Sequence, residues 1–364
     1  MIDAQRGLAI LFMAIVHAAF FSKVSVMAEY YVDRHTALWN WPWWAIGVLC
    51  NASAPTFWLL SGVSLRLLAE RNRRRFGTED ATWRFLLVRI VLFFALDASL
   101  IPWFWRPMRD FRFTYEFELL SSLGVSMLLV GIVRKLPDRV LGIACALLLL
   151  GYPGLVHLIS PSAHATGPVW LKPFLFYDSV YNPTVSFPVL GWGGLMLLGW
   201  VLAPRMKEPA FQRPRTWFLI GLALHLVWIT IRLTGGYGGF MTWNRGHGLR
   251  EFFILCEGPP GIDYLAMNLA DGAWLFALLW AAKDRLDRAP LRWLVMLGQA
   301  SFFSYMLHLP LYKFLARAGL KVLPTATVPR YLVVLLLGLV IMVPAAGLWR
   351  QVKKRYPDGI PHYL

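Results

Sequence analysis

Long runs of hydrophobic residues alternate with short polar segments along most of this chain. A helix rises 1.5 Å per residue, so about 20 apolar residues cross the roughly 30 Å hydrocarbon core of a bilayer. Ten runs approach or reach this length, at about 7–27, 43–69, 85–104, 117–134, 139–159, 188–204, 216–236, 263–282, 293–312 and 331–349. The pattern predicts an all-α, polytopic transmembrane helix bundle with about ten spans.

The composition favours a membrane protein over a soluble one. Of the 364 residues, 58% are hydrophobic and only 15% are charged, and the mean hydropathy is +0.53. Soluble domains carry about 25% charged residues, and a soluble fold of this size has too little interior to bury so much apolar surface. The cysteines at positions 50, 145 and 256 lack metal-ligand spacing, so we expect buried thiols and no metal.

The net charge is +16, but the basic residues are distributed according to the predicted spans, so the charge does not indicate a nucleic-acid partner. When each Lys and Arg is assigned to the nearer end of its span, 23 of the 36 fall on the side of the N-terminus. Cytoplasmic loops carry such an excess. We therefore expect both termini in the cytoplasm and a multi-pass protein of the inner (cytoplasmic) membrane. One integral domain over 1–350, followed by a short basic tail over 351–364, is the simplest organisation.

Arg6 and His17, in the first hydrophobic run, are the first candidates for chemistry. At 100° per residue they share one face of a helix, about 16 Å apart along its axis. A guanidinium at the inner surface suits phosphate, and an imidazole near mid-membrane suits proton transfer. We expect the two side chains to face a common channel. The simpler alternative is a structural His17 beside a snorkelling Arg6.

The sequence around this pair resembles a known family. The segment 2–17 resembles the opening of the heparan-alpha-glucosaminide N-acetyltransferase-like membrane proteins, and the spacing of Arg6 and His17 is that of the related acyltransferase-3 family. Similar segments follow in the same order, at 54–64, 119–125, 187–192 and 297–310. The resemblance extends over essentially the whole chain and implies an integral membrane acyltransferase.

This resemblance implies transfer of an acyl group, expected to be acetyl, from cytoplasmic acyl-CoA to a hydroxyl or amine of a glycan or lipid-linked acceptor on the outer side. By the same likeness, Arg6 and His17 match the motif pair for donor binding and catalysis. Heparan-type members often carry Asn at the position of His17 and a functional His in the next outer loop, where His35 is the counterpart. His17, His35 or both therefore act, through an acyl-histidine or by general-base catalysis.

Other polar residues complete the predicted site. Asp97, in the third run, and Asp271, in the eighth, are candidates to orient an imidazole, with a structural ion pair as an equal alternative. The remaining candidates are Arg71, Arg74 and Ser61 for the donor, and Trp39, Trp43 and His308 for the acceptor. The alternatives are helix packing for Ser61, an interfacial aromatic belt for the two tryptophans, setting of the membrane topology for the two arginines, and a satisfied hydrogen bond for His308. We expect His225 to pack against neighbours and Arg232 to snorkel.

Two other functions fit the same pattern. Buried Asp97, Asp271 and His17 are typical of a proton relay in a transporter or exporter, although no inverted repeat is visible in the sequence. A non-catalytic subunit of a membrane complex would keep the same helix bundle. The sequence leaves open the acceptor, the acyl chain length and any partner chains, and binding of acetyl-CoA separates the enzyme from the transporter.

Overall fold

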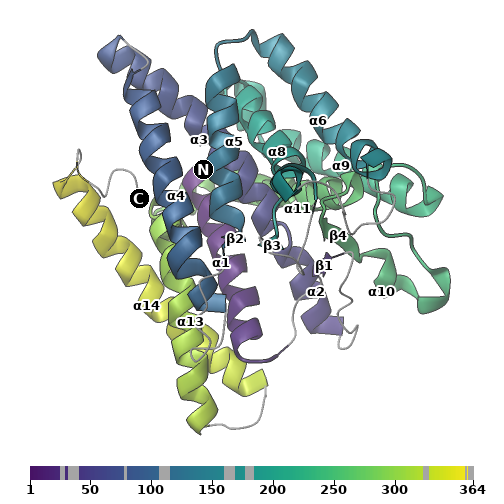
Figure 1. Cartoon of the computed structure of the whole chain (residues 1–364). Helices are drawn as coiled ribbons and strands as arrows, with labels where there is room; N and C mark the ends of the chain where they lie inside the picture. Colours follow the sequence, from purple (N-terminus) through teal and green to yellow (C-terminus); the bar gives the residue numbers. More distant parts are fainter. Residues whose placement is uncertain are drawn as a thin grey trace.

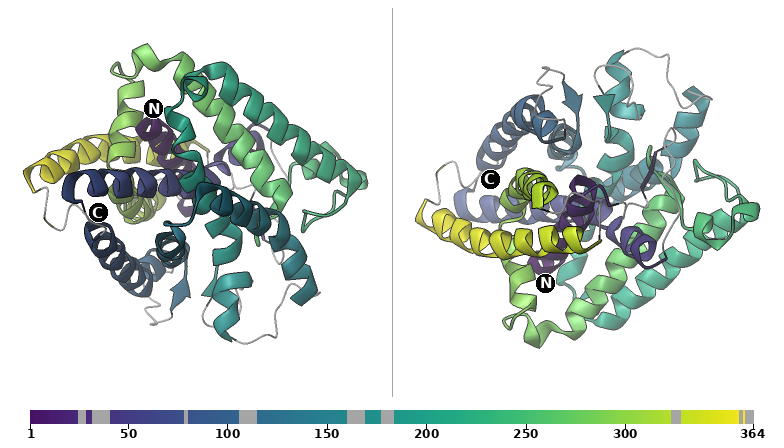
Figure 2. Two further views of the ribbon diagram at one scale, coloured as in Figure 1. Left: turned by 90° about the horizontal axis from the view of Figure 1, so that it is seen from above. Right: turned by 90° about the horizontal axis from the view of Figure 1, so that it is seen from below.

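The computed structural model of the chain is a bundle of long helices around α1, Ile2–Phe21 (Figure 1; Figure 2). It describes residues 1–24, 29–31, 41–77, 80–105, 115–159, 169–176, 184–322, 328–356 and 359. For 29–31, 41–43, 247, 250 and 320–322 it describes the backbone alone. Within these ranges, α1 packs against α3, α12, α13 and α14, so the segment with the first candidate residues lies at the centre.

Helices supply almost all of the architecture. The long ones are α3 (Ser53–Phe76), α4 (Asp80–Trp105), α6 (Asp138–Ile159), α9 (Pro214–Thr234), α11 (Ile262–Ala281), α13 (Ser301–Val322) and α14 (Val328–Arg355). The shorter ones are α2 (Trp41–Cys50), α5 (Leu119–Val133), α7 (Lys172–Leu175), α8 (Val189–Leu202), α10 (Leu249–Phe252) and α12 (Leu291–Gln299). Two parallel strand pairs join connecting segments, β1 (Glu29–Tyr31) with β4 (Leu255–Gly258) and β2 (Glu116–Phe117) with β3 (Thr184–Val185).

Each predicted hydrophobic run overlaps a helix, but the helices differ in length. Among the described residues, seven are long and apolar enough to cross a membrane, or eight if the bent pair α12–α13 is one span. Helices α5 and α8 have 15 and 14 residues, or about 21 to 23 Å, which is shorter than the hydrocarbon core. The all-α membrane bundle is confirmed, whereas ten complete crossings stay a prediction.

The outer faces of the bundle carry large apolar side chains. Val91 on α4 is 70% exposed, Leu158 on α6 is 81% exposed and Val340 on α14 is 69% exposed. Water disfavours such exposed surface, but lipid chains are as apolar as these side chains. The surface therefore suits a multi-pass membrane protein.

Glycines bring α1 and α12 into contact backbone to backbone. A Cβ on Gly298 would lie 1.7 Å from the carbonyl oxygen of Asp3, and one on Gly7 would lie 1.8 Å from that of Leu294. Small residues permit this close approach between membrane helices. The start of α1 is thereby held against the C-terminal end of α12, where the chain bends by 98° into α13.

The start of α1 and the end of α14 lie at the same end of the bundle (Figure 1), because Ile2 and Lys353 line one cavity. Helix α14 continues to Arg355, so the first residues of the predicted tail are helical. The domain division after 350 and the cytoplasmic side of this end stay predictions.

Candidate active site

A cavity of about 660 Å³ lies at the end of the bundle where α1 begins and α14 ends. Residues from α1, α3, α4, α5, α12, α13 and α14 line it. Its charged lining consists of Asp3, Arg6, Arg71, Arg89 and Lys353. Four cations face a single carboxylate, so the cavity favours a ligand with several negative charges. We call it the donor cavity.

Arg6 enters the donor cavity from the second turn of α1. Its Nη1 lies 3.3 Å from Oδ1 of Asp3, and the two side chains are 20% and 37% exposed. An ion pair exposed to this degree is weak. The guanidinium has five N–H groups, so it keeps donors for a phosphate after meeting Asp3.

Arg89 reaches the donor cavity from α4 between aromatic rings. Its guanidinium carbon lies 5.1 to 5.5 Å from the ring centres of Phe85, Phe93 and Phe302. Its Nε is buried without a hydrogen bond to any described residue, and Oε1 of Gln299, in the same cavity, is buried in the same way. Buried polar atoms are nearly always paired, because an unmade hydrogen bond costs free energy. These two atoms therefore indicate a site that a polar ligand completes.

Three of the four residues predicted to bind the donor, Arg6, Arg71 and Ser61, line this cavity. The Oγ of Ser61 donates to the backbone carbonyl one turn before it, at 2.8 Å. Arg74 lies instead in an adjoining groove of about 370 Å³ that shares Arg71 with the cavity. The residues predicted to bind the donor therefore lie partly in the donor cavity and partly in the adjoining groove.

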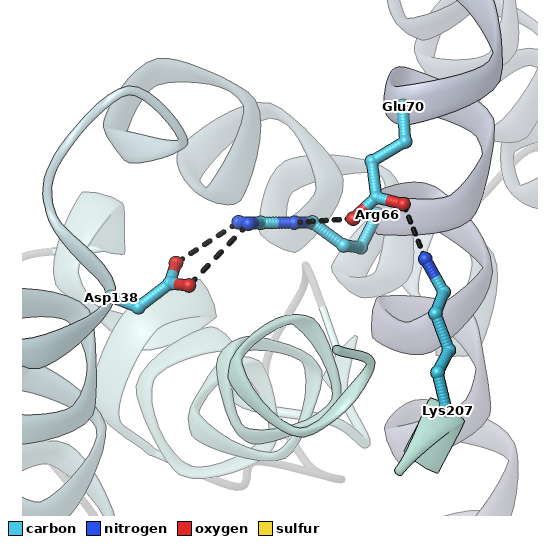
Figure 3. A network of polar contacts seen from close by, with 4 residues as sticks. All are labelled: Arg66, Glu70, Asp138 and Lys207. Atoms are coloured by element: carbon cyan, nitrogen blue, oxygen red, sulfur yellow. Dashed lines mark hydrogen bonds and ion pairs between the residues drawn. The ribbon is translucent and has the colours of Figure 1, made fainter. Parts of the chain in front are cut away.

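An ion-pair network next to this groove ties α3 to α6 and to the short turn 205–207 (Figure 3). Arg66 donates from Nη1 to Oδ1 of Asp138 at 3.1 Å and from Nε to Oε1 of Glu70 at 3.2 Å. Nζ of Lys207 lies 2.5 Å from the other oxygen of Glu70. Every charge in this network has an opposite partner, so its part is to hold helices together.

His17 lies further along α1, against α13 and the end of α4. Its Nδ1 is 2.7 Å from Nε2 of His308, and the ring of Trp105 packs edge-on with the centroids 5.0 Å apart. His308 is fully buried, and its Nδ1 pairs with the carbonyl oxygen of Tyr305. The structure thus joins two predicted site histidines that are 291 positions apart in the chain.

His17 is not among the residues that line the donor cavity. Because α1 is one continuous helix, Arg6 and His17 are about 16 Å apart along its axis. The predicted donor-binding and catalytic groups therefore occupy one helix, while the common channel between them stays a prediction.

Asp97 and Asp271 have different partners. Asp97 is fully buried, and its Oδ2 accepts a hydrogen bond from the backbone N–H of Ser121 at 2.6 Å. A carboxyl at the start of α5 suits the positive end of that helix. In contrast, Oδ1 of Asp271 lies 3.2 Å from Nε2 of His225. Asp271 is thus the acid that contacts an imidazole, and the geometry of Asp97 is that of a helix cap.

Several predictions concern the outer side of the molecule. His35 and Trp39 lie outside the described residues, and for Trp43, in α2, only the backbone is described. His308 has 0% exposure and both of its ring nitrogens have partners, so this geometry does not support its predicted contact with an acceptor.

The expectation that Arg232 snorkels to the surface is wrong. Its side chain is 3% exposed, and the guanidinium donates to the backbone carbonyls of Met241, Glu251 and Phe252. These carbonyls belong to the connection between α9 and α11. Arg232 therefore stabilises that connection.

Arg89, Gln299 and Lys353 are not among the site residues predicted from the sequence, although all three line the donor cavity. Arg89 lies four positions inside a predicted span, where an arginine is a signal of function. Gln299 lies within one of the segments that carry the resemblance. The position of Lys353 beside Arg6 depends on the packing of the two chain ends, which spacing does not reveal.

A family model described as heparan-alpha-glucosaminide N-acetyltransferase, catalytic, matches residues 1–231. The chain belongs to this family. Its members are N-acetyltransferases, and with its long apolar helices the chain is a multi-pass membrane protein of that family. No curated protein matches the chain. The matched range holds Arg6, His17, Arg71 and Arg89, while Gln299, His308 and Lys353 lie beyond it.

Proposed function

We propose that this protein transfers an acetyl group from cytoplasmic acetyl-CoA to a hydroxyl or amine of a glycan or lipid-linked acceptor on the outer side of the membrane. The observation that carries the proposal is the donor cavity, with four cations against one carboxylate and two buried polar atoms without partners. Membership of the N-acetyltransferase family supports acetyl transfer. The basic character of this end supports a cytoplasmic donor.

The residues of the donor cavity suit coenzyme A. This molecule carries a diphosphate and a 3′-phosphate, so several cations are needed to bind it. Arg6, Arg71, Arg89 and Lys353 are the residues that would hold these phosphates, through charge-assisted hydrogen bonds. The N-terminus of α13 begins at Ser301 in the same lining, and the positive end of a helix favours phosphate.

His17 supplies the proton transfer. The pantetheine arm of the donor spans the distance from the phosphates to the imidazole, about 16 Å along α1. In a direct transfer, the acceptor oxygen or nitrogen attacks the thioester carbonyl while its proton passes to His17. The new C–O or C–N bond forms, the C–S bond breaks, and the thiolate of coenzyme A takes the proton.

An acyl-enzyme route uses the same imidazole. His17 attacks the thioester carbonyl, the C–S bond breaks, and coenzyme A leaves as the thiolate while His17 holds the acetyl group as a cation. The acceptor then attacks the acetyl group, the C–N bond to His17 breaks, and the proton of the acceptor goes to the thiolate. Ping-pong kinetics identify this route, whereas a direct transfer needs both substrates bound together. His35 is the other candidate for either role.

Purified protein supplied with radiolabelled acetyl-CoA and glucosamine, as the acceptor probe, tests this function. We expect labelled product and free coenzyme A thiol. His17→Ala should lower the rate by about 10²-fold or more, because general acid–base catalysis contributes about 10²–10⁴-fold. The affinity for acetyl-CoA should not change, since His17 does not line the donor cavity.

His225→Gln is the matched control, because His225 is a second half-buried histidine within a span. It should keep near-normal activity. Full activity in His17→Ala would move the catalytic assignment to His35. A wild-type protein that neither binds acetyl-CoA nor releases its thiol would favour the transporter or the non-catalytic subunit.

A further inference from the structure

We propose that His308 is a positioning residue for acyl transfer: it holds His17 in the tautomer with the proton on Nδ1 and so leaves Nε2 of His17 free to act on the substrates. The inference rests on the proposed function, because it takes His17 as the catalytic imidazole. It assigns His308, which lies beyond the matched range 1–231, to the catalytic half of the site.

The surroundings of His308 fix its own tautomer. The carbonyl oxygen of Tyr305 accepts hydrogen bonds but cannot donate them, so the facing Nδ1 of His308 carries a proton. His308 is 0% exposed, and an imidazolium without a carboxylate partner is disfavoured in such a place. A neutral imidazole has a single N–H. The Nε2 of His308 therefore presents a lone pair.

That lone pair fixes the tautomer of His17. Nδ1 of His17 lies 2.7 Å from Nε2 of His308, so the proton between them belongs to Nδ1 of His17. The two ring planes are 21° apart with the centroids separated by 5.0 Å, as expected when the N–H of one ring points at the in-plane lone pair of the other. A neutral His17 then has its own lone pair on Nε2.

The free nitrogen of His17 is placed for chemistry. Among the described residues, Nε2 of His17 has no hydrogen-bond partner, and the ring is half-buried. Rotation of the ring by 180° about the Cβ–Cγ bond would place Cδ2 where Nδ1 lies and so remove the hydrogen bond to His308. The edge-on contact with Trp105 and the hydrogen bond to His308 both oppose that rotation.

Both chemical routes require this arrangement. As a general base, Nε2 of His17 takes the proton of the acceptor, and as a nucleophile it takes the acetyl group. In either case His17 becomes cationic, and its Nδ1–H then makes a charge-assisted hydrogen bond to His308. His308 thus resembles the third group of a catalytic triad, which orients the base without contacting the substrate.

Nitrogen NMR of protein labelled with ¹⁵N at its histidine side chains measures the tautomers directly. The spectra of His17→Gln and His308→Gln assign the two rings. We expect the wild-type protein to show a protonated Nδ1 and an unprotonated Nε2 for both residues. A proton on Nε2 of His17 would overturn the inference, whatever the activity of the protein.

Two substitutions of His308 separate positioning from packing. The side-chain oxygen of Gln can accept a hydrogen bond near the position of Nε2, whereas Leu cannot accept one. With acetyl-CoA and glucosamine as probes, we expect His308→Leu to lower kcat by about tenfold or more and His308→Gln to restore most of it. KM for acetyl-CoA should stay unchanged in both, because His308 does not line the donor cavity.

The outcomes distinguish this inference from the proposed function. If His17→Ala is inactive while His308→Leu keeps the kcat of the wild type, the positioning role is wrong and the proposed function stands. If His17→Ala is fully active, the catalytic assignment itself is wrong. Should neither substitution at His308 yield folded protein, the tautomers of the wild-type protein decide.

Discussion

The ion-pair network of Figure 3 and the donor cavity each contain an arginine of α3, but the two arginines have different surroundings. Arg66 and Arg71 are five positions apart on α3. Arg66 is bonded to Asp138 and Glu70, whereas Arg71 lines the donor cavity and forms no ion pair with a described residue. The residue type is the same and only the partners differ. An arginine without a partner at a cavity wall is therefore the better indicator of a ligand.

The network and the donor cavity also differ in the free energy that their charged groups contribute. The side chains of Arg66, Glu70 and Asp138 are 20%, 28% and 49% exposed, so solvent screens the network and each pair contributes little. Arg89 is flanked by aromatic rings, and its Nε is sealed from solvent without a partner. A bound phosphate would offset the free energy of keeping that charge and that N–H unpaired.

The strongest effect should come from a substitution that disrupts the donor cavity and leaves the ion-pair network intact. Gly298→Leu places a side chain where the carbonyl of Asp3 lies 1.7 Å from the new Cβ, so α1 and α12 must separate. We expect the free energy of unfolding to fall by about 3 kcal/mol or more and binding of acetyl-CoA to be lost. Thermal unfolding and a binding titration measure the two effects.

Gly142→Leu is the matched control for this substitution. Gly142 is also a helical glycine, on α6, but a Cβ there would meet no atom within 4 Å. Its unfolding temperature and its affinity for acetyl-CoA should stay near those of the wild type. Equal damage from both substitutions would mean that the α1–α12 contact has no special importance.

The next effect concerns the cations of the donor cavity. Arg89→Gln removes a group that would bond to a phosphate, and a hydrogen bond to a charged group contributes about 1.5–3 kcal/mol. Since 1.4 kcal/mol is a factor of ten, the affinity for acetyl-CoA should fall about 10- to 100-fold. Arg84→Gln removes the same charge from an exposed position on α4 outside the cavity. It should change the affinity by less than about twofold.

The smallest effect is expected for the network. Arg66→Gln should lower the free energy of unfolding by about 1 kcal/mol or less, because the ion pairs are partly exposed. The affinity for acetyl-CoA should not change, since Arg66 does not line the donor cavity. If Arg66→Gln weakened donor binding as much as Arg89→Gln, the distinction between network and cavity would be lost.

The hydrophobic pattern predicts where the helices lie, but it does not predict which of them cross the membrane as one straight span. The run at 293–312 looks continuous, yet the chain bends by 98° between Gln299 and Ser301. The bend directly follows the part of α12 that packs backbone to backbone on α1, where Gly298 meets the carbonyl of Asp3. The hydrophobic pattern of one segment contains no information about a contact with a distant segment. It therefore cannot distinguish a short or bent span from a straight one.

The site was partly predictable for a similar reason. Arg6, Arg71 and Ser61 come together as expected, because resemblance in order and spacing carries information about three-dimensional position. Lys353 and the pairing of His17 with His308 depend on helices that meet across almost the whole chain. Which face of a helix turns inward decides these contacts, and the sequence of one chain leaves that rotation undetermined.

Calorimetric titration of the wild-type protein with acetyl-CoA and with acetyl-pantetheine, which lacks the phosphates, measures whether the donor cavity binds the phosphates of the donor. The cations of the donor cavity should make acetyl-CoA bind saturably, at one site per chain, and about 100-fold or more tighter than acetyl-pantetheine. Equal affinity for the two compounds, or no binding of acetyl-CoA, would contradict the assignment of this cavity to the donor.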